Sequence, residues 1–116
     1  NDRHGHEVGD GVLIQVANLM REGKRSCDFL ARWGGEELAM ILPDTPGEAA
    51  AAIARRLTDA LREFEFRTIA GVVRVTASAG VAEMTPDCGD VDEMFARADA
   101  RVMQAKSAGR DQIVSG

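Results

Sequence analysis

The chain has 116 residues, of which 45% are hydrophobic, and it carries a formal net charge of −5. This length suits a single domain with a hydrophobic core of its own. The acidic balance argues against a nucleic-acid-binding groove, but it leaves room for a local cationic pocket that binds one nucleotide.

The sequence gives no sign of membrane insertion or export. It contains neither a run of about 18 apolar residues that could span a bilayer nor a segment that resembles a signal peptide. Cys27 and Cys88 lack the spacing and histidine pattern of a zinc site, so reduced thiols are expected. We therefore expect a cytoplasmic segment without membrane contact.

Apolar residues at helical spacing predict a first helix from about His6 to Arg21. Two short strands, Cys27–Trp33 and Glu37–Leu42, follow it. They flank a double glycine, which suits the turn of a β-hairpin.

Thr45, Pro46 and Glu48 predict the start of a second helix, through a capping box with proline at the first helical position. The face of this helix that we expect to be buried contains Ala50, Ile53, Leu57, Ala60, Leu61 and Phe64.

Residues 66–70 and 72–82 predict a further hairpin, with Gly71 in its turn and a longer, more buried second strand. Asp90 and Glu93 predict a capping box at the start of a last helix, and Gly109 its end. A short strand at Gln112–Val114 is expected to close the chain.

This order of elements predicts an α+β fold, in which an antiparallel central sheet is flanked by helices. It matches a ferredoxin-like βαββαβ layout whose first strand is missing from this chain. Because that strand lies at the centre of such a sheet, we expect its absence to matter for association and ligand binding.

The turn of the first hairpin carries two glycines and two carboxylates. Gly34 and Gly35 allow positive φ and let a phosphate approach the backbone. Glu36 and Glu37 supply oxygens suited to Mg²⁺, although neighbouring strand residues point to opposite faces. The same four residues also fit a plain turn with solvated glutamates, because short motifs match by chance.

Four segments stand in order along almost the whole chain: NDRHGHEVGDGVL before the first long helix, RSCD, GGEEL and the C-terminal AKSAGRDQIV. They resemble, in family order, motifs of the GGDEF family of diguanylate cyclases, in which RSCD matches the inhibitory motif and GGEEL the signature. The resemblance implies one GGDEF domain over residues 1–116, with a nucleotidyl-cyclase palm that lacks its N-terminal strand and the preceding helix.

In this family the substrate is GTP. The resemblance assigns guanine recognition, contact with the substrate at the turn, and the grip on the terminal phosphates to Asn1 and Asp10, to Gly34 and Gly35, and to Lys106 and Arg110, respectively. Apart from the resemblance, Asp10 is an ordinary carboxylate near a helix start. Lys106 and Arg110 then simply complement the negative end of a helix.

The resemblance also implies the metal site. Glu36 matches the metal-binding acid of the signature and Glu37 its catalytic neighbour, with two Mg²⁺ or Mn²⁺ ions expected in each active site. A further family ligand, an aspartate on the first strand, is not in this chain.

Arg25 and Asp28 match the inhibitory site at which the family binds cyclic di-GMP, and Arg56 lies where a second arginine often joins them. Arginine can fork onto a phosphate or a guanine edge, and aspartate can accept from guanine N–H groups. An RxxD string also fits a plain surface ion pair.

Some positions depart from the family pattern. Leu38 replaces a more frequent phenylalanine, and Asp111 stands where asparagine is frequent. His4 and His6 are expected in a loop, without a metal.

The resemblance therefore implies a domain that condenses two GTP into cyclic di-GMP, releases two pyrophosphates and is inhibited by its product. Its expected partners are a second copy in a homodimer and an upstream sensor or regulatory domain of the parent protein. The alternative is an inactive module that binds GTP or cyclic di-GMP without turnover.

Overall fold

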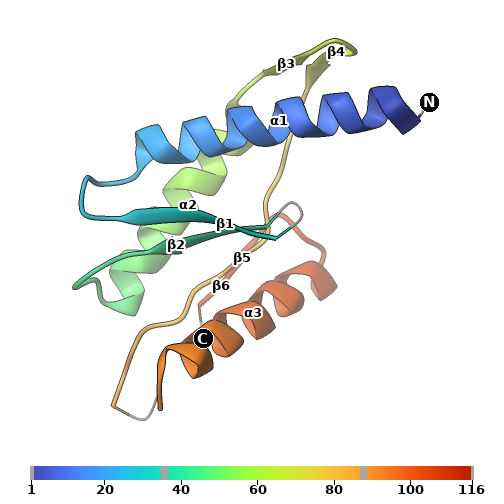
Figure 1. Ribbon diagram of the computed structural model, residues 1–116. Coiled ribbons are helices and arrows are strands. Elements are labelled where there is room, and N and C mark those ends of the chain that lie inside the picture. Colours follow the sequence, from blue (N-terminus) through green and yellow to red (C-terminus); the bar gives the residue numbers. More distant parts are fainter. Residues whose placement is uncertain (1, 35–36, 87–88, 116) are drawn as a thin grey trace. The chain divides into compact units, whose positions relative to one another are not determined.

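The computed structural model describes residues 2–34, 37–86 and 89–115, with the backbone alone for residues 2–7 and 33–34. Figure 1 shows the elements in chain order: α1 (Asp2–Gly23), β1 (Phe29–Gly34), β2 (Glu37–Ile41), α2 (Gly47–Glu63), β3 (Phe66–Thr68), β4 (Gly71–Val73), β5 (Ala79–Gly80), α3 (Val91–Ser107) and β6 (Ile113–Val114). This content confirms the predicted α+β class.

The contacts divide the chain into two compact units. The first consists of Asn1–Pro43 and Glu63–Val75, and the second of Asp44–Arg62 and Thr76–Gly116. Among the described residues the strands form three separate pairs, β1 with β2, β3 with β4, and β5 with β6. The assignment of residues 1–116 to one domain stays a prediction.

Helix α1 of the first unit is longer than the sequence predicts. It begins at Asp2 instead of His6, so His4 and His6 lie in the helix and their assignment to a loop is wrong. Gly9 and Gly11, which each weaken a helix by about 1 kcal/mol relative to alanine, both lie inside the helix. A Cβ at either position would meet no atom within 4 Å, so packing does not require these glycines.

The hairpin of β1 and β2 confirms the two predicted strands. Of the double glycine predicted at its turn, Gly34 ends β1 and Gly35 lies outside the described residues. Phe29 pairs with Ile41 and Arg32 with Leu38, and the register shifts between Arg32 and Gly34. Because side chains alternate along a strand, Leu30 and Arg32 share one face and Phe29 lies on the other. Phe29 is 65% exposed, so that second face is open.

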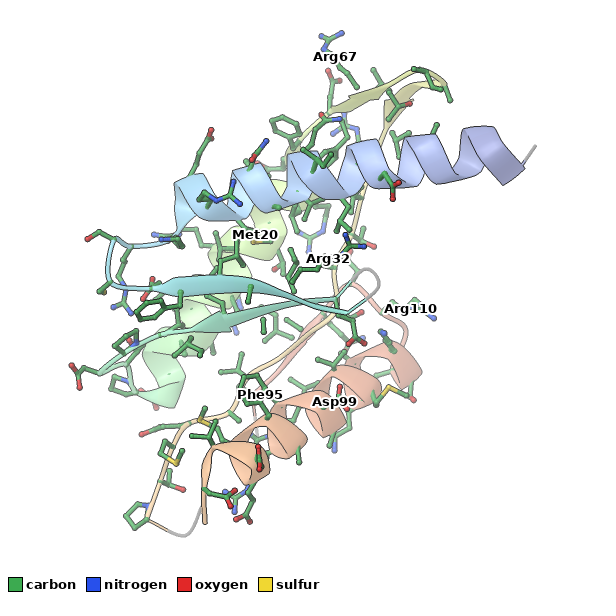
Figure 2. The ribbon with its side chains drawn as sticks, in the orientation of Figure 1. Met20, Arg32, Arg67, Phe95, Asp99 and Arg110 are labelled. Carbon is green, nitrogen blue, oxygen red and sulfur yellow. The ribbon has the colours of Figure 1, made fainter. Side chains whose placement is uncertain are left out.

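Strands β3 and β4 form the second predicted hairpin, and Gly71 adopts a φ of 104°, which favours glycine. The Gln15 amide of α1 holds this hairpin: its Nε2 donates to Arg67 O at 2.7 Å, and its Oε1 accepts from Arg67 N at 3.3 Å. In Figure 2 the Arg67 side chain points away from α1.

The long strand predicted over residues 72–82 is wrong. Strand β4 ends at Val73, and residues 74–78 belong to none of the strand pairs described above. A strand needs a partner for its backbone donors and acceptors, and among the described residues β3 pairs only as far as Val73.

The buried phenylalanine is Phe66, which has no exposed surface, whereas Phe64 is 41% exposed. The prediction placed Phe64 in the core as part of the second helix. Helix α2 ends at Glu63, so Phe64 leaves the helical face, and its ring packs at 4.7 Å from that of Phe66.

Helix α2 begins at Gly47, one residue later than predicted. Ala50 N donates to Pro46 O at 2.9 Å, and the Glu83 carboxylate accepts from Gly47 N at 2.7 Å. A carboxylate at this end is favourable, because the first amides of a helix lack intrahelical partners. The buried residues of α2 are Ala50, Ala51, Leu57, Thr58 and Leu61.

Strands β5 and β6 pair in parallel, with Ala79 opposite Ile113, whereas the expected sheet is antiparallel. A parallel pair needs a crossover, and α3 provides it. A Cβ on Gly80 would meet the α3 backbone at Ala98 O and, at 2.6 Å, at Val102 N. Only glycine lets the strand lie this close to the helix.

The predicted start of α3 is confirmed. Asp90 is the N-cap and accepts from Glu93 N at 2.9 Å. The Glu93 carboxylate in turn accepts from Gly89 N at 2.5 Å, one residue before the amide that a standard capping box would use.

Candidate functional site

An open hollow of about 390 Å³ lies in the first unit, between α1 and the β1–β2 hairpin. Its size falls in the range of small-molecule sites. It is lined by Asp10, Leu13, Ile14, Ala17 and Arg21 of α1, by Leu30, Ala31 and Arg32 of β1, and by Leu38 of β2.

The lining combines apolar walls with a few charged groups. Leu13, Leu30 and Leu38 offer surface on which a flat ring can pack, and the exposed carboxylate of Asp10 can accept hydrogen bonds from ring N–H groups. The structure thus places the predicted Asp10 at a hollow that suits a purine base.

Sequence reasoning missed Arg32 as a member of this lining. Figure 2 shows it between β1 and α1, where Met20 also lies. A signal was available, since Arg32 is two residues from Leu30 and therefore shares its strand face. Arg32 is exposed, so its place on this face brings a cation to the hollow.

The structure describes some of the residues that are predicted to form the site at the turn. Glu37 is exposed at the start of β2 and pairs with Gly34 across the hairpin. Asn1, Gly35 and Glu36 lie outside the described residues. Within the described part, no group of three or more His, Cys, Asp and Glu side chains is arranged to hold a metal ion.

Arg25 and Asp28 are brought together in a tight turn. Arg25 Nε donates to both carboxylate oxygens, at 3.1 and 3.0 Å, and Nη2 donates to Oδ1 at 2.7 Å. Arg25 N also donates to Oδ2 at 2.9 Å, and Asp28 N donates back to Arg25 O at 3.0 Å. The carboxylate is fully buried, whereas the Arg25 side chain is 41% exposed.

This geometry explains the acidity of Asp28. Hydrogen bonds from the Arg25 side chain lower the pKa of the carboxyl from its usual 3.8 to about 2, against the opposing effect of burial. The same contact raises the pKa of Arg25. Both groups are therefore charged at neutral pH.

Lys106 and Arg110 lie in the second unit, around the C-terminal end of α3. Arg110 N donates to Ala105 O at 2.9 Å, and Gly109 N donates to Lys106 O at 3.4 Å. These two bonds form a Schellman motif with Gly109 at a φ of 118°, which confirms the predicted helix end. The motif sets the backbone from which both cations project.

A second arginine–aspartate fork joins α2 to the segment after α3. Arg62 Nε donates to both Asp111 oxygens at 3.1 Å, and Nη2 donates to Oδ1 at 2.8 Å. This contact lowers the pKa of Asp111. Sequence reasoning missed it, because the partners are 49 residues apart and share no motif.

The predicted residues divide between the two units. Asp10, Glu37, Arg25 and Asp28 belong to the first, and Arg56 of α2 belongs to the second together with Lys106 and Arg110. The structure therefore shows an α+β chain with an open hollow in its first unit and a cationic turn in its second.

Comparison with known proteins identifies the family. The family model described as "Diguanylate cyclase, GGDEF domain" matches residues 1–112. The chain is 37% identical over 113 residues to the probable diguanylate cyclase DgcE of Escherichia coli K12, covering 97% of this chain and 10% of the relative. It is 35% identical over 115 residues to diguanylate cyclase DgcM of the same organism, covering 99% and 27%. The chain thus spans only a small part of these relatives.

Solved structures of diguanylate cyclases and GGDEF domains are similar to this chain in fold. Diguanylate cyclase SiaD of Pseudomonas aeruginosa, solved with its activator SiaC, gives a TM-score of 0.89 at 38% identity, over 98% of this chain and 44% of that one. The GGDEF domain of DgcB from Caulobacter crescentus, solved with c-di-GMP, gives 0.88 at 29%, over 98% and 68%. An active GGEEF domain from Vibrio cholerae gives 0.86 at 29%, over 97% and 71%.

This chain therefore belongs to the GGDEF family of diguanylate cyclase domains, and its α+β fold is the family's fold. Over residues 2–34, 37–86 and 89–115, no helix is both long and apolar enough to cross a membrane.

Proposed function

We propose that this chain is the catalytic domain of a diguanylate cyclase, which condenses two GTP into cyclic di-GMP and releases two pyrophosphates. The match of the family model over residues 1–112 carries the proposal. The GGEE sequence at the turn supports it, because the related Vibrio cholerae domain with a GGEEF signature is described as active.

Guanine recognition belongs to Asn1 and Asp10. The hollow lined by Asp10 supports this assignment, since its apolar walls suit a purine ring. The Asp10 carboxylate then accepts from N1 and N2 of the base, donors that adenine does not offer in this arrangement. Asn1 adds an amide that both donates and accepts.

The terminal phosphates belong to Lys106 and Arg110, with the backbone of Gly34 and Gly35 beside the phosphate chain. The described residues offer no acidic partner to the side chain of either cation, which leaves both charges available to an anion. Lys106 lies in the last turn of α3 and Arg110 just after the helix end, an arrangement that suits two neighbouring phosphates.

The metal belongs to Glu36, with Glu37 beside it in the catalytic turn. Carboxylate oxygens are the donors that Mg²⁺ and Mn²⁺ accept, so the residue types at the turn fit such ions. Two bound ions would neutralise charge that develops at the α-phosphate.

The reaction needs two copies of the chain, each with one GTP. The 3′-hydroxyl of each GTP forms a bond to the α-phosphorus of the other and gives up its proton. The bond from that phosphorus to the β-phosphate bridging oxygen breaks, and pyrophosphate leaves. Because the two GTP are held on two chains, catalysis requires a homodimer. An upstream sensor or regulatory domain of the parent protein controls the formation of this dimer. The reaction takes place in the cytoplasm, which supplies GTP.

Product inhibition belongs to Arg25, Asp28 and Arg56. Arg25 is the exposed member of its pair and forks onto a phosphate or a guanine edge. The Asp28 carboxylate is covered in this structure, so it orients Arg25 and reaches the product itself only when the fork opens.

Mass spectrometry of the purified protein with GTP and Mg²⁺ tests the proposal. We expect cyclic di-GMP and pyrophosphate in a ratio of one to two, and a loss of at least about 100-fold in Glu36→Gln. Glu22→Gln is the control: it changes an exposed glutamate of α1, away from the turn, and should leave the rate unchanged. Binding of GTP or cyclic di-GMP without any product would favour the inactive module instead.

A further inference from the structure

The segment that follows α3 holds an unusual backbone. Gly109, Arg110 and Asp111 have φ values of 118°, 64° and 49°. Glycine adopts positive φ freely, but an arginine does so rarely, and two consecutive non-glycine residues in this region are rarer still. Within the segment, Gln112 Nε2 donates to Ala108 O at 3.0 Å and to Arg110 O at 3.2 Å, which helps to hold this conformation.

The Arg62–Asp111 fork adds a contact from outside the segment. It ties Asp111 to the last turn of α2 through two guanidinium nitrogens, Nε and Nη2. The remaining nitrogen, Nη1, donates to Asp59 Oδ1 at 2.7 Å. With its nitrogens bound by two carboxylates, Arg62 has little freedom, and Asp111 is anchored to a helix instead of to a loop.

Arg110 precedes the anchored Asp111 in the chain, but the side chain of Arg110 is not anchored in this way. Its backbone is fixed by the bond to Ala105 O, while its side chain is exposed and has no hydrogen-bond or ionic partner among the residues that the structure describes. Figure 2 shows Arg110 beyond the C-terminal end of α3. One arginine is thus committed to the scaffold and the other is available.

We propose that Arg62 and Asp111 are positioning residues, which hold Arg110 in the conformation that binds the terminal phosphates of GTP. The inference rests on the proposed function, since it takes Arg110 as a phosphate ligand. Neither residue touches GTP, and they act through the backbone of the turn.

The pair also solves an electrostatic problem. A carboxylate next to Arg110 in sequence would by itself repel a phosphate. Three hydrogen bonds from two nitrogens of Arg62 neutralise Asp111, so the turn keeps a cationic tip although it contains an acid.

Asp111→Asn separates this role from simple electrostatics. Asparagine tolerates positive φ, so the local backbone preference stays while the ionic anchor is lost. Removing a negative charge beside a phosphate site should tighten GTP binding if charge alone mattered. The positioning role predicts the reverse, a GTP affinity roughly fivefold weaker.

Calorimetry with GTP and, separately, with GMP provides the measurement. Because Arg110 serves the terminal phosphates, we expect Asp111→Asn and Arg62→Gln to weaken GTP binding and to leave GMP binding within about twofold. Arg74→Gln is the matched control, since it removes an exposed arginine that pairs with Glu65 at 3.4 Å in the other unit. It should change neither affinity.

Three results would overturn the inference. Unchanged or tighter GTP binding in Asp111→Asn would reject the positioning role and leave the proposed function standing. An equal loss of GTP and GMP affinity would do the same. If the unmodified protein bound no GTP, the proposed function and this inference would fall together. Should Asp111→Asn not fold, as judged by circular dichroism, Arg62→Gln decides by the same comparison of GTP with GMP.

Discussion

Two arginine–aspartate forks, one in each compact unit, use the same pair of side chains under different conditions. Arg25 and Asp28 are three residues apart, and the carboxylate is fully buried. Arg62 and Asp111 are 49 residues apart, and their side chains are 42% and 36% exposed.

The difference teaches what each fork can do. A buried carboxylate that loses its cation is left without water, so the Arg25–Asp28 fork matters for folding. An exposed fork contributes little to stability, because water and salt screen it. Its use must lie in geometry, which is why we connect the Arg62–Asp111 fork to the placement of Arg110.

The largest effect is expected in product binding. Replacing Arg25 with alanine should weaken the binding of cyclic di-GMP by about 30-fold, because a forked contact to a phosphate or guanine edge is lost. Arg62→Ala removes an arginine with similar bonds and should leave this affinity unchanged. Titration calorimetry with cyclic di-GMP measures both, and equal losses in the two variants would abolish the distinction that we draw.

The next effect concerns stability. Asp28→Asn leaves one oxygen where two accept from Arg25, and it sets an NH₂ group against the guanidinium. We expect a fall in thermal midpoint of roughly 5–10 °C, against less than about 2 °C for Asp111→Asn. Thermal unfolding followed by circular dichroism is the measurement. A larger fall in Asp111→Asn would show that exposure does not decide the strength of these forks.

The forks also show how far the sequence reaches. Arg25 and Asp28 share one turn, so a local motif predicts their contact, as it predicts the β1–β2 hairpin and both ends of α3. Arg62 and Asp111 meet only after α3 has crossed back, and no local pattern pairs them. For the same reason, hydropathy did not foresee that β4 ends at Val73 or that β5 and β6 are parallel, since both depend on partners distant in sequence.

In the candidate site, too, some residues follow from a local motif and others depend on elements distant in sequence. Asp10 was predicted from its motif and lies at the hollow, but the walls of the hollow come from three elements. Arg32 was missed because its role depends on which strand face meets α1. The sequence thus predicts residues with a family signature better than it predicts the residues that surround them.

The smallest effect is the dependence of stability on pH. The pKa of Asp28 is about 2 in the folded chain, below its usual 3.8, so between these values the unfolded chain binds more protons than the folded one. The stabilisation by this fork is complete above about pH 4 to 5 and is lost as the pH falls toward 2. The difference in thermal midpoint between the unmodified protein and Asp28→Asn should therefore shrink by about half or more between pH 5 and pH 2. Asp111→Asn, measured over the same range, should stay close to the unmodified protein throughout. A difference for Asp28→Asn that is constant with pH would mean that the fork acts through packing and not through the charge of its carboxylate.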